Sequence, residues 1–517
     1  MNKIFTFMMI IIAWTISAQD VTVTLSPLYK FPKNSSVPEF LCENNGEYYF
    51  LRSEAHGLFS FKYNFFLEKY NDSFEQVKSK EISVSKDDIN YNGSVYINQK
   101  LALMISDNDK DRDIISYKIV PISLEGKSSK PITVSKFKYE RKRDIPTTSW
   151  ILTNDTTKIL FMAESDNDSK KENYQIHLVS IDDNLNKIWD KTMKFSKTEA
   201  QVKMLSSVIN PNGEVYLLYK IYDDKKREKK DDKAAYEIQL MYIKNDSAEV
   251  KKFALNISDK FIKSANLRLR DNGELYSVGL YSNTVDGPTH GVFFLKIVDG
   301  EVTLSTKREF SENDLEKLGK RKSDKDKSGE KGLKDNFRFN DMQIIEDGSA
   351  FVTVEPNYVV EYSSTNSRGV MSTSYVYYSE DIIIININPQ GDIDRLSILP
   401  KFQSNPESTL FLSHKSFAYK DKVYLFYNED EDNYKNPVGS KPKRTSYYGD
   451  FIATMTTLDK NGNFDRKALF SYEDSDSIFI PDSIEKISPS KYILVATKRK
   501  LFTSKSTYMF STIQINN

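Results

Sequence analysis

A run of alternating aspartates begins like a calcium-binding loop. The segment SDNDKDRD places an aspartate at every second position from Asp107 to Asp113, and carboxylate oxygens are ligands that Ca²⁺ prefers. The pattern then departs from such a loop, because Arg112 stands where the glycine should be and Lys118 where the closing carboxylate should be. We expect a solvated hairpin tip without a bound metal; a calcium site is the alternative.

Other residue types that carry chemistry do not form a known pattern. The four histidines are far apart in the chain: His56, His177, His290 and His414. A histidine metal site needs several of them to converge, and this spacing does not favour one. The single cysteine, Cys42, is predicted to be a small buried residue. The sequence has no G-x-S-x-G, H-E-x-x-H, G-x-x-x-x-G-K or C-x-x-C motif, and no cofactor is expected.

Two tyrosine-rich segments, residues 358–378 and 427–448, are candidates for a binding surface. A tyrosine side chain has a rigid apolar body and a polar tip, which suits protein interfaces and sugar rings. The candidate binding residues are Tyr362, Tyr375, Tyr377, Tyr378, Tyr434, Tyr447 and Tyr448. The alternative for each of them is that it packs within a strand.

These residues belong to a chain whose pattern repeats. The phrase NPNGEVYLLYKIYDD at Asn210–Asp224 returns as RDNGELYSVGLYSN at Arg270–Asn283. Each copy has a turn, a strand, a variable polar stretch and two further strands, and one short extended run precedes it. The same order can be followed through eight units, spaced by roughly 45 to 70 residues, and each unit except the last has four strands.

Four-stranded sheets at such spacing indicate an all-β fold, a β-propeller of antiparallel blades. One sheet cannot bury both of its faces, so neighbouring blades stack around an axis. We expect a single propeller domain over residues 19–517 with eight blades, or seven if one unit is misread; two β-sandwiches are the competing architecture. The last unit lacks its fourth strand, and we expect Val21–Phe31 to supply it by pairing with Ser506–Asn516.

The variable polar stretches all fall between the second and third strands of their units, which places them on one face of a propeller. A charged insert at residues 311–336 connects two blades on the same face, and its start is predicted to form a short helix capped by Ser311. Loops on rigid scaffolds often carry function. The two tyrosine-rich segments belong to units six and seven, so we expect them to lie side by side and to form one aromatic patch.

The N-terminal segment MNKIFTFMMIIIAWTISAQD is typical of a signal peptide. Lys3 precedes an apolar run over Ile4–Ile16, and we expect cleavage between Ala18 and Gln19. A membrane anchor is the alternative, but the run is shorter than the ~18 residues that a spanning helix needs. We therefore expect an exported protein without a transmembrane segment, located in the periplasm, on the outer-membrane surface or outside the cell.

The charge balance argues against nucleic acid as a partner. Lys plus Arg and Asp plus Glu each number 73, so the formal net charge is zero. Nucleic-acid binders are usually strongly basic overall.

One stretch, mainly residues 358–433, resembles known sequences. The segment SYVYYSEDIIIININPQGDIDRLSILPKFQ, followed by KVYLFYNEDEDN, resembles a group of secreted β-propeller-like proteins of Bacteroidetes-type bacteria. A Tyr-rich run, a DII strand, a P-G-I turn and a PK-Q segment recur in that group, and the resemblance lies mainly over residues 358–433. The group has no assigned activity, so the resemblance implies no catalytic residue.

We therefore expect a binding or scaffold protein of the cell envelope or the medium. Its partner would be a glycan, a peptide or an envelope protein, recognised through the loop-rich face. The alternative is a glycoside hydrolase or lyase with carboxylates at the axis, although the sequence does not identify a catalytic pair. Two carboxylates that converge at the axis, about 5 to 10 Å apart, would favour the enzyme.

Overall fold

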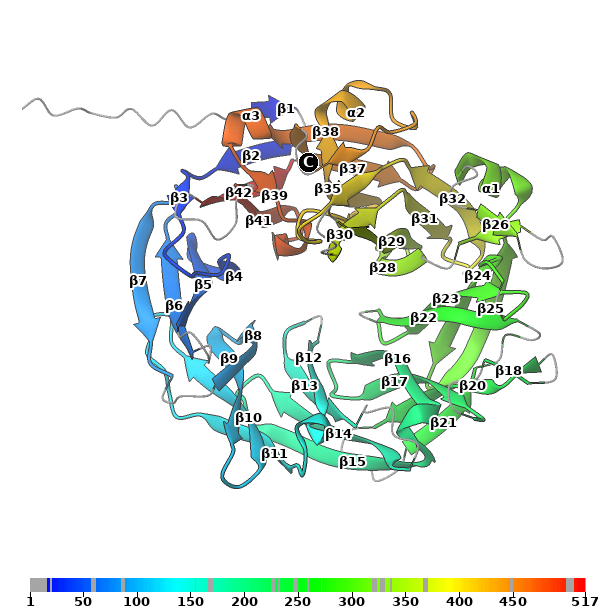
Figure 1. Ribbon diagram of the computed structural model, residues 1–517, viewed down its shortest axis with the longest axis horizontal. Coiled ribbons are helices and arrows are strands. Elements are labelled where there is room, and N and C mark those ends of the chain that lie inside the picture. Colours follow the sequence, from blue (N-terminus) through cyan, green and yellow to red (C-terminus); the bar gives the residue numbers. More distant parts are fainter. Residues whose placement is uncertain are drawn as a thin grey trace, which may run out of the picture.

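The fold is a ring of antiparallel sheets (Figure 1). The computed structural model describes residues 16–18 and 21–516, except 57–61, 85–88, 154, 166–170, 225–227, 231–232, 245–249, 256, 258–259, 271, 286, 319–322, 326–330, 335–336, 366–370, 447–449 and 499–505. In this part of the chain six sheets have four strands, and two sheets of seven strands each contain the same four-stranded unit. The predicted all-β propeller architecture is confirmed, with one such sheet for each of the eight repeat units.

Every unit runs from the centre of the ring outwards. The innermost strands are β4 (Glu39–Asn44), β8 (Ile89–Ile97), β12 (Thr147–Leu152), β16 (Val202–Ile209), β22 (Phe261–Leu269), β28 (Phe337–Ile344), β34 (His414–Tyr419) and β40 (Glu485–Ser488). The second strands are β5 (Glu47–His56), β9 (Lys100–Asp109), β13 (Lys158–Glu164), β17 (Val215–Tyr222), β23 (Leu275–Ser282), β29 (Ala350–Thr365), β35 (Lys422–Asp430) and β41 (Lys491–Thr497). The third strands are β6 (Lys62–Tyr70), β10 (Ile114–Ile122), β14 (Asn173–Asp182), β20 (Tyr236–Ile243), β24 (Gly291–Val298), β31 (Ile382–Ile387), β37 (Phe451–Asp459) and β42 (Thr507–Ile515). The outer strands are β7 (Gln76–Ile82), β11 (Ile132–Lys138), β15 (Lys187–Thr198), β21 (Val250–Ala254), β25 (Glu301–Glu309), β32 (Ile393–Leu399), β38 (Phe464–Ser471) and β2 (Val21–Leu25).

Short elements decorate this frame. The additional strands are β1 (Ile16–Ala18), β3 (Tyr29–Lys30), β18 (Lys229–Lys230), β19 (Lys233–Ala234), β26 (Ser323–Lys325), β27 (Lys331–Leu333), β30 (Met371–Ser379), β33 (Gln403–Asn405), β36 (Thr445–Ser446) and β39 (Ile478–Phe479). The helices are α1 (Glu312–Leu318), α2 (Glu431–Lys435) and α3 (Tyr472–Ser475), with 3-10 turns at Lys142–Asp144, Glu199–Gln201 and Pro481–Ser483. None of the helices in the described residues is long and apolar enough to cross a bilayer.

The repeated N-G phrase forms the turn between the innermost and second strands. Gly213 and Gly273 have φ values of +82° and +87°, a region that glycine enters without steric cost. Their amides donate to the carbonyls of Asn210 and Arg270, at 2.8 and 3.0 Å. The similarity of the two phrases therefore reflects one turn geometry used in successive sheets.

Hydrophobic clusters between successive sheets hold the ring together. Seven such clusters each join two sheets that are neighbours in the chain, and an eighth joins the last sheet to the first. In that closing cluster the rings of Phe50 and Phe510 stack with centroids 3.9 Å apart, and the hydroxyls of Tyr70 and Tyr508 lie 3.3 Å apart. Cys42 is buried, as predicted, in the cluster between the first two sheets.

The N-terminal strand completes the last sheet, as the sequence predicted. β2 pairs antiparallel with β42, with Val21 opposite Ile515 and Leu25 opposite Ser511, and β3 extends the pairing to Tyr508. β1 pairs in turn with β2. The cleavage predicted after Ala18 would remove β1 and leave β2 as the outer strand.

The insert between the fifth and sixth sheets also follows the prediction at its start. α1 begins after Ser311, whose Oγ accepts a hydrogen bond from the Asp314 amide at 3.1 Å. Further along, Thr289 and Leu333 exchange backbone hydrogen bonds of 2.7 and 2.8 Å. The insert is thereby fixed to the β23–β24 connection.

Removal of β2 and β3 should destabilise the whole ring. Val21 and Val23 are buried against the neighbouring sheet, and the burial of two valines contributes about 3 to 6 kcal/mol. A chain that starts at Pro32 should therefore melt many degrees below a chain that starts at Val21, in thermal unfolding followed by circular dichroism. Equal melting temperatures would contradict closure by the N-terminal strand.

Candidate functional site

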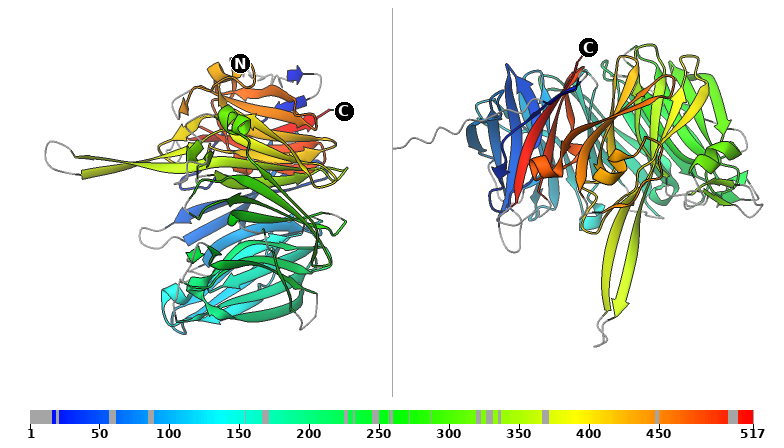
Figure 2. Two further views of the ribbon diagram at one scale, coloured as in Figure 1. Left: turned by 90° about the vertical axis from the view of Figure 1, so that its right-hand side faces the viewer. Right: turned by 90° about the horizontal axis from the view of Figure 1, so that it is seen from above.

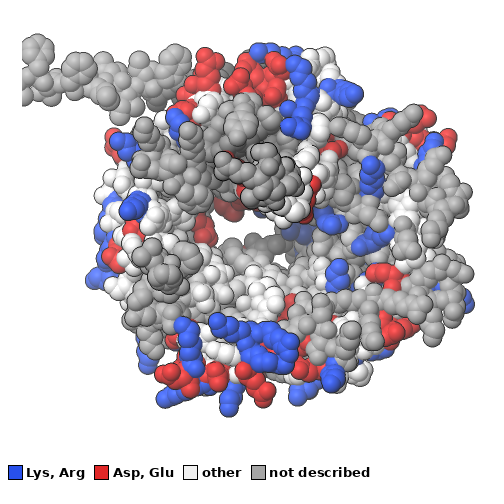
Figure 3. All heavy atoms as spheres, viewed as in Figure 1, with Lys and Arg blue, Asp and Glu red and all other residues white. Residues whose placement is uncertain are grey.

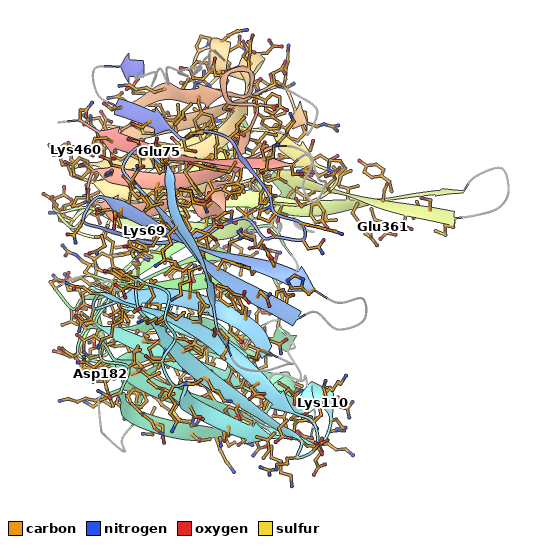
Figure 4. All side chains as sticks on the ribbon, turned by 90° about the vertical axis from the view of Figure 1, so that its left-hand side faces the viewer. Lys69, Glu75, Lys110, Asp182, Glu361 and Lys460 are labelled. Atoms are coloured by element: carbon orange, nitrogen blue, oxygen red, sulfur yellow. The ribbon has the colours of Figure 1, made fainter. Side chains whose placement is uncertain are left out.

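The two faces of the ring differ in their connections. The connections between second and third strands lie on one face, which we call the loop face. Lys110 in the β9–β10 connection and Glu361 on β29 project on this side, whereas Asp182 at the end of β14 and Lys460 in the β37–β38 turn lie on the other (Figure 4). The predicted placement of the variable connections on one face is confirmed for these segments.

A long hairpin projects from the loop face. β29 pairs with β31 from Ala350 to Val354 and then leaves the ring to pair with β30 from Asn357 to Thr365. We call the projecting part the arm; it consists of Asn357–Thr365 and Met371–Ser379 (Figure 2). Among these described residues Glu361 is the only charged one. The arm is therefore a nearly neutral two-stranded ribbon that extends into solvent.

The register divides the arm's large side chains between two faces, because successive residues of a strand point to opposite sides. Tyr362 lies on the same face as Tyr358 and Tyr378, whereas Tyr375 and Tyr377 lie on the opposite face. The tyrosines of the arm therefore do not form the single aromatic patch that we expected. The exposed large side chains are Val359 (50%), Tyr362 (49%), Met371 (67%) and Tyr375 (47%).

The base of the arm is packed rather than exposed. The rings of Tyr358 and Tyr378 stack with centroids 4.9 Å apart, and the Tyr358 hydroxyl donates to Glu380 at 2.6 Å. Tyr378 is buried, and burial together with the adjacent Tyr362 hydroxyl raises its pKa. Tyr378 therefore supports the arm, while Tyr362 and Tyr375 are its accessible tyrosines and Tyr377 is half-buried.

The second predicted tyrosine segment lies beside this base. β33 pairs with β30, and β36 pairs in parallel with β33, which connects units six and seven through one sheet. The guanidinium of Arg466 lies over the ring of Tyr434 on α2, 5.0 Å from the ring centroid. The Tyr434 hydroxyl accepts a hydrogen bond from the Ala468 amide at 2.9 Å. Tyr434 thus makes structural contacts, and Tyr447 and Tyr448 lie outside the described residues.

A buried ion pair fixes the point where β29 leaves the ring. Glu355 lies between the part of β29 that pairs with β31 and the arm, and its carboxylate pairs with the ammonium of Lys401. The Lys401 ammonium also donates to Ser379 Oγ and Gln403 Oε1, each at 2.9 Å. The side chains of Glu355 and Lys401 are fully buried. The pair therefore ties β29, β30 and the segment before β33 together.

The same carboxylate connects the sixth and seventh sheets. Asn340 of β28 and Ser413, just before β34, donate to Glu355 Oε2 at 2.9 and 2.6 Å, and His414 Nδ1 lies 3.1 Å from the same oxygen. Burial alone would raise the pKa of the Glu355 carboxyl, but Lys401 and His414 outweigh it and hold this pKa well below its usual range. Glu355 is thus an ionised hub beneath the arm. Sequence reasoning missed it because its partners are distant in the chain.

A second buried carboxylate lies close to this hub. Glu429 near the end of β35 is 1% exposed, and its Oε2 lies 3.5 Å from Arg466 Nη1. Burial raises the pKa of Glu429 to about 7, although Arg466 and Lys401 partly offset this effect. Glu429 therefore titrates near neutral pH at the base of the arm.

The ring also has a cavity at its centre, where Figure 3 shows a hollow bordered in part by acidic side chains. A cavity of about 470 Å³ is lined by residues of β4, β8 and β40, together with Leu152 and Thr156. Glu39 and Glu485 both line it. This volume lies in the range of small-ligand sites.

Three glutamates line this cavity, Glu39, Glu43 and Glu485, and the surroundings of Glu39 and Glu485 differ. Glu39 accepts hydrogen bonds from the Tyr91 hydroxyl at 2.6 Å and from Ser94 Oγ at 2.7 Å. Burial raises the pKa of Glu485, the Lys415 ammonium opposes this shift and the Glu39 carboxylate adds to it. The axis therefore holds several carboxylates, of which Glu39 and Glu485 have unlike environments, and the sequence alone did not identify them.

The acidic hairpin tip is balanced by cations of the same hairpin. Asp107 pairs with Lys118 at 2.7 Å, and Arg112 lies 3.8 Å from Asp109. A cavity of about 510 Å³ at this tip is lined by these residues and their neighbours. Within the described residues no group of three or more His, Cys, Asp or Glu has the geometry of a metal site. Residues 109–113 are exposed, as predicted for a solvated tip, and the absence of a bound metal stays a prediction.

The histidines lie in separate environments. His56 is exposed at the end of β5, and His177 Nδ1 lies 2.9 Å from Thr192 Oγ1. His290 is buried beside Ser282, and His414 contacts Glu355. Burial lowers the pKa of His177.

Comparison with known proteins does not assign a family. No protein-family model matches the chain, and no curated protein does either. Among solved structures, a mutant of the apocarotenoid oxygenase of Synechocystis is similar with a TM-score of 0.31 and 8% identity, over 64% of this chain and 67% of that one. The β-propeller domain of the Trilobed protease from Pyrococcus furiosus is similar with a TM-score of 0.35 and 10% identity, over 86% of this chain and 98% of that one.

The pKa of Glu429 predicts a pH-dependent stability. Its folded-state pKa of about 7 exceeds the ordinary value of 4.5, so the folded protein holds a proton that the unfolded chain releases. The bound proton stabilises the folded state fully below pH ~4.5. This stabilisation is lost as the pH rises to ~7, which lowers the free energy of unfolding by about 3 kcal/mol in total. Glu429→Gln should therefore stabilise the protein in urea unfolding at pH 8 but not at pH 4.5. Glu473→Gln, at an exposed position of α3, is the control; an equal gain at both pH values for Glu429→Gln would refute the shift.

Proposed function

We propose that the protein is an exported binding or scaffold protein that recognises its partner through the loop face, with the arm as the main contact surface. One observation carries this proposal. Eleven large hydrophobic side chains are exposed among the described residues, and four of them lie on the arm, whereas no other described strand has more than one. Exposed apolar patches on soluble proteins often mark binding sites.

The chemistry of the arm suits a glycan, a peptide or a protein partner. Its described residues are mainly tyrosine, serine, threonine and valine, with the single charge of Glu361. Recognition would therefore depend on aromatic contact and hydroxyl hydrogen bonds rather than on charge. The signal-like N-terminus supports a location in the periplasm, on the outer-membrane surface or outside the cell.

Substitution of the exposed tyrosines should weaken partner binding. A buried aromatic anchor contributes about 2 kcal/mol or more to an interface, roughly thirtyfold in affinity. Tyr362→Ala and Tyr375→Ala should reduce retention on a glycan array and from envelope extract by at least roughly that factor. Tyr63→Ala is the matched control, because Tyr63 is a 40% exposed tyrosine on β6, away from the arm.

Circular dichroism would establish that the ring of each variant is intact. If both arm variants bind as the parent does, or if the parent binds nothing in either assay, the arm is not the recognition surface. The cavity at the axis would then be the better candidate.

The carboxylates at the axis favour one second candidate, a glycoside hydrolase or lyase. Such enzymes use a pair of carboxyl groups, one of which has a raised pKa and donates a proton to the leaving group. Glu485 has the raised pKa, and Glu39 is the carboxylate of the same cavity that adds to this shift. The unlike environments of these two residues are the observation that supports this reading.

A test of catalysis uses the release of reducing ends from a panel of envelope and plant polysaccharides. An enzyme should lose activity by at least ~100-fold on Glu485→Gln or Glu39→Gln, as expected for loss of acid–base catalysis. Glu301→Gln on the outer strand β25 should leave the activity unchanged, because Glu301 is exposed far from the cavity lining. Absence of any release by the parent protein would exclude this candidate for the substrates in the panel.

A further inference from the structure

The edge of β30 is unusual for a strand that projects into solvent. β33 pairs with β30 only at Tyr377, Tyr378 and Ser379. From Met371 to Val376 β29 is its only partner in the described residues. Proteins usually protect such edges with lysine, proline or a bulge, and this part of β30 has none of these in its register.

The exposed side chains of β30 are self-complementary. Met371 and Tyr375 are the two large exposed residues of this strand, and both lie on the face that also carries Val359. A twofold axis through Thr373 would place Met371 opposite Tyr375 of the partner subunit and Tyr375 opposite Met371 of the partner subunit. Antiparallel partners have side chains on the same side of the sheet, and a methionine sulfur packs favourably on an aromatic ring.

We propose that two copies of this chain associate through antiparallel pairing of their β30 edges, centred on Thr373, to give a four-stranded sheet β29–β30–β30–β29. The pairing would involve Met371–Tyr375 and would leave the β33 contact at Tyr377–Ser379 in place. An isolated two-stranded ribbon is marginally stable in water, so two further strands would stabilise the arm as well.

The shape and charge of the molecule favour a second copy as the occupant. The arm extends beyond the loop face (Figure 2), so antiparallel arms would hold the two rings at opposite ends of the shared sheet. The chain has no net charge, and the arm's one described charge, Glu361, lies on β29 and not on the pairing edge. Like charges therefore do not oppose this contact.

The association would enlarge the recognition surface proposed for the arm. Only this enlargement depends on the proposed function, whereas the dimerisation itself does not. The faces that carry Val359 and Tyr375 would become continuous across the twofold axis. A repetitive partner such as a polysaccharide could then contact both arms at once, and bivalent contact raises avidity without a new type of site. The association itself can be measured on purified protein with no ligand present.

Single cysteines test the register directly, because the only native cysteine is the buried Cys42. Thr373→Cys places two thiols opposite each other at the twofold axis, within reach of a disulfide after modest adjustment. Ser372→Cys is the matched control, because residue 372 would face Ser374 of the partner subunit and the two thiols would be separated diagonally. Under mild oxidation Thr373→Cys should give a covalent dimer on a non-reducing denaturing gel. Ser372→Cys should run as a monomer on the same gel, although its β30 edges still associate non-covalently.

Sedimentation velocity from micromolar to submillimolar concentration gives the second measurement. The parent should shift from monomer to dimer as its concentration rises. Thr373→Lys should stay monomeric, because it places two ammonium groups together at the twofold axis. Ser363→Lys should still dimerise, because Ser363 lies on the same face as Thr373 but on β29, away from the pairing edge. A parent that stays monomeric throughout, or equal cross-linking of both cysteine variants, overturns the inference. A dimer without ligand capture would support the association while refuting arm-mediated recognition, so the two failures are distinguishable.

Discussion

The pairing of β2 with β42 is the constraint on which the rest of the structure depends. Every sheet buries both faces against its neighbours, so an open ring would leave two faces and two strand edges in water. The N-terminal strand closes the last sheet, and the stacked rings of Phe50 and Phe510 join that sheet to the first. Each sheet is held in place only by its neighbours. The loss of this junction therefore weakens all eight contacts between sheets and lets the residues at the axis and on the loop face change their relative positions.

Within this closed frame, Glu355 sets where the arm begins. β29 passes from a buried, paired strand to a solvent-exposed ribbon within a few residues, and the transition coincides with the fully buried Glu355–Lys401 pair. A buried ion pair is a weak source of stability, because desolvation offsets much of the attraction. Its geometry is nevertheless demanding, since Ser413 and Asn340 must also reach the carboxylate. The pair therefore fixes the position of the arm and contributes little to the stability of the ring.

The sequence predicted the features that depend on local pattern. Alternating strands, the N-G turns and the missing fourth strand are properties of short segments, and they were sufficient for the repeat units, for the closing strand and for the cap at Ser311. It did not predict that β29 continues as an arm with tyrosines on two faces, because that depends on where pairing changes from β31 to β30. Nor did it predict Lys401 or the meeting of Glu39 and Glu485, since the ring brings these residues together from distant units.

The architecture separates the residues that hold the ring from those available for recognition. Side chains of the arm beyond its base contact few ring residues, because Val359, Tyr362, Met371 and Tyr375 are about half exposed or more. Their loss should therefore change the stability of the ring little, in contrast to the loss of Phe510. The carboxylates at the axis have no such freedom, because the strands that carry them, β4 and β40, form the first and last innermost strands of the ring. A change in binding without a change in stability is thus a signature of the arm, whereas coupled changes in both indicate the axis.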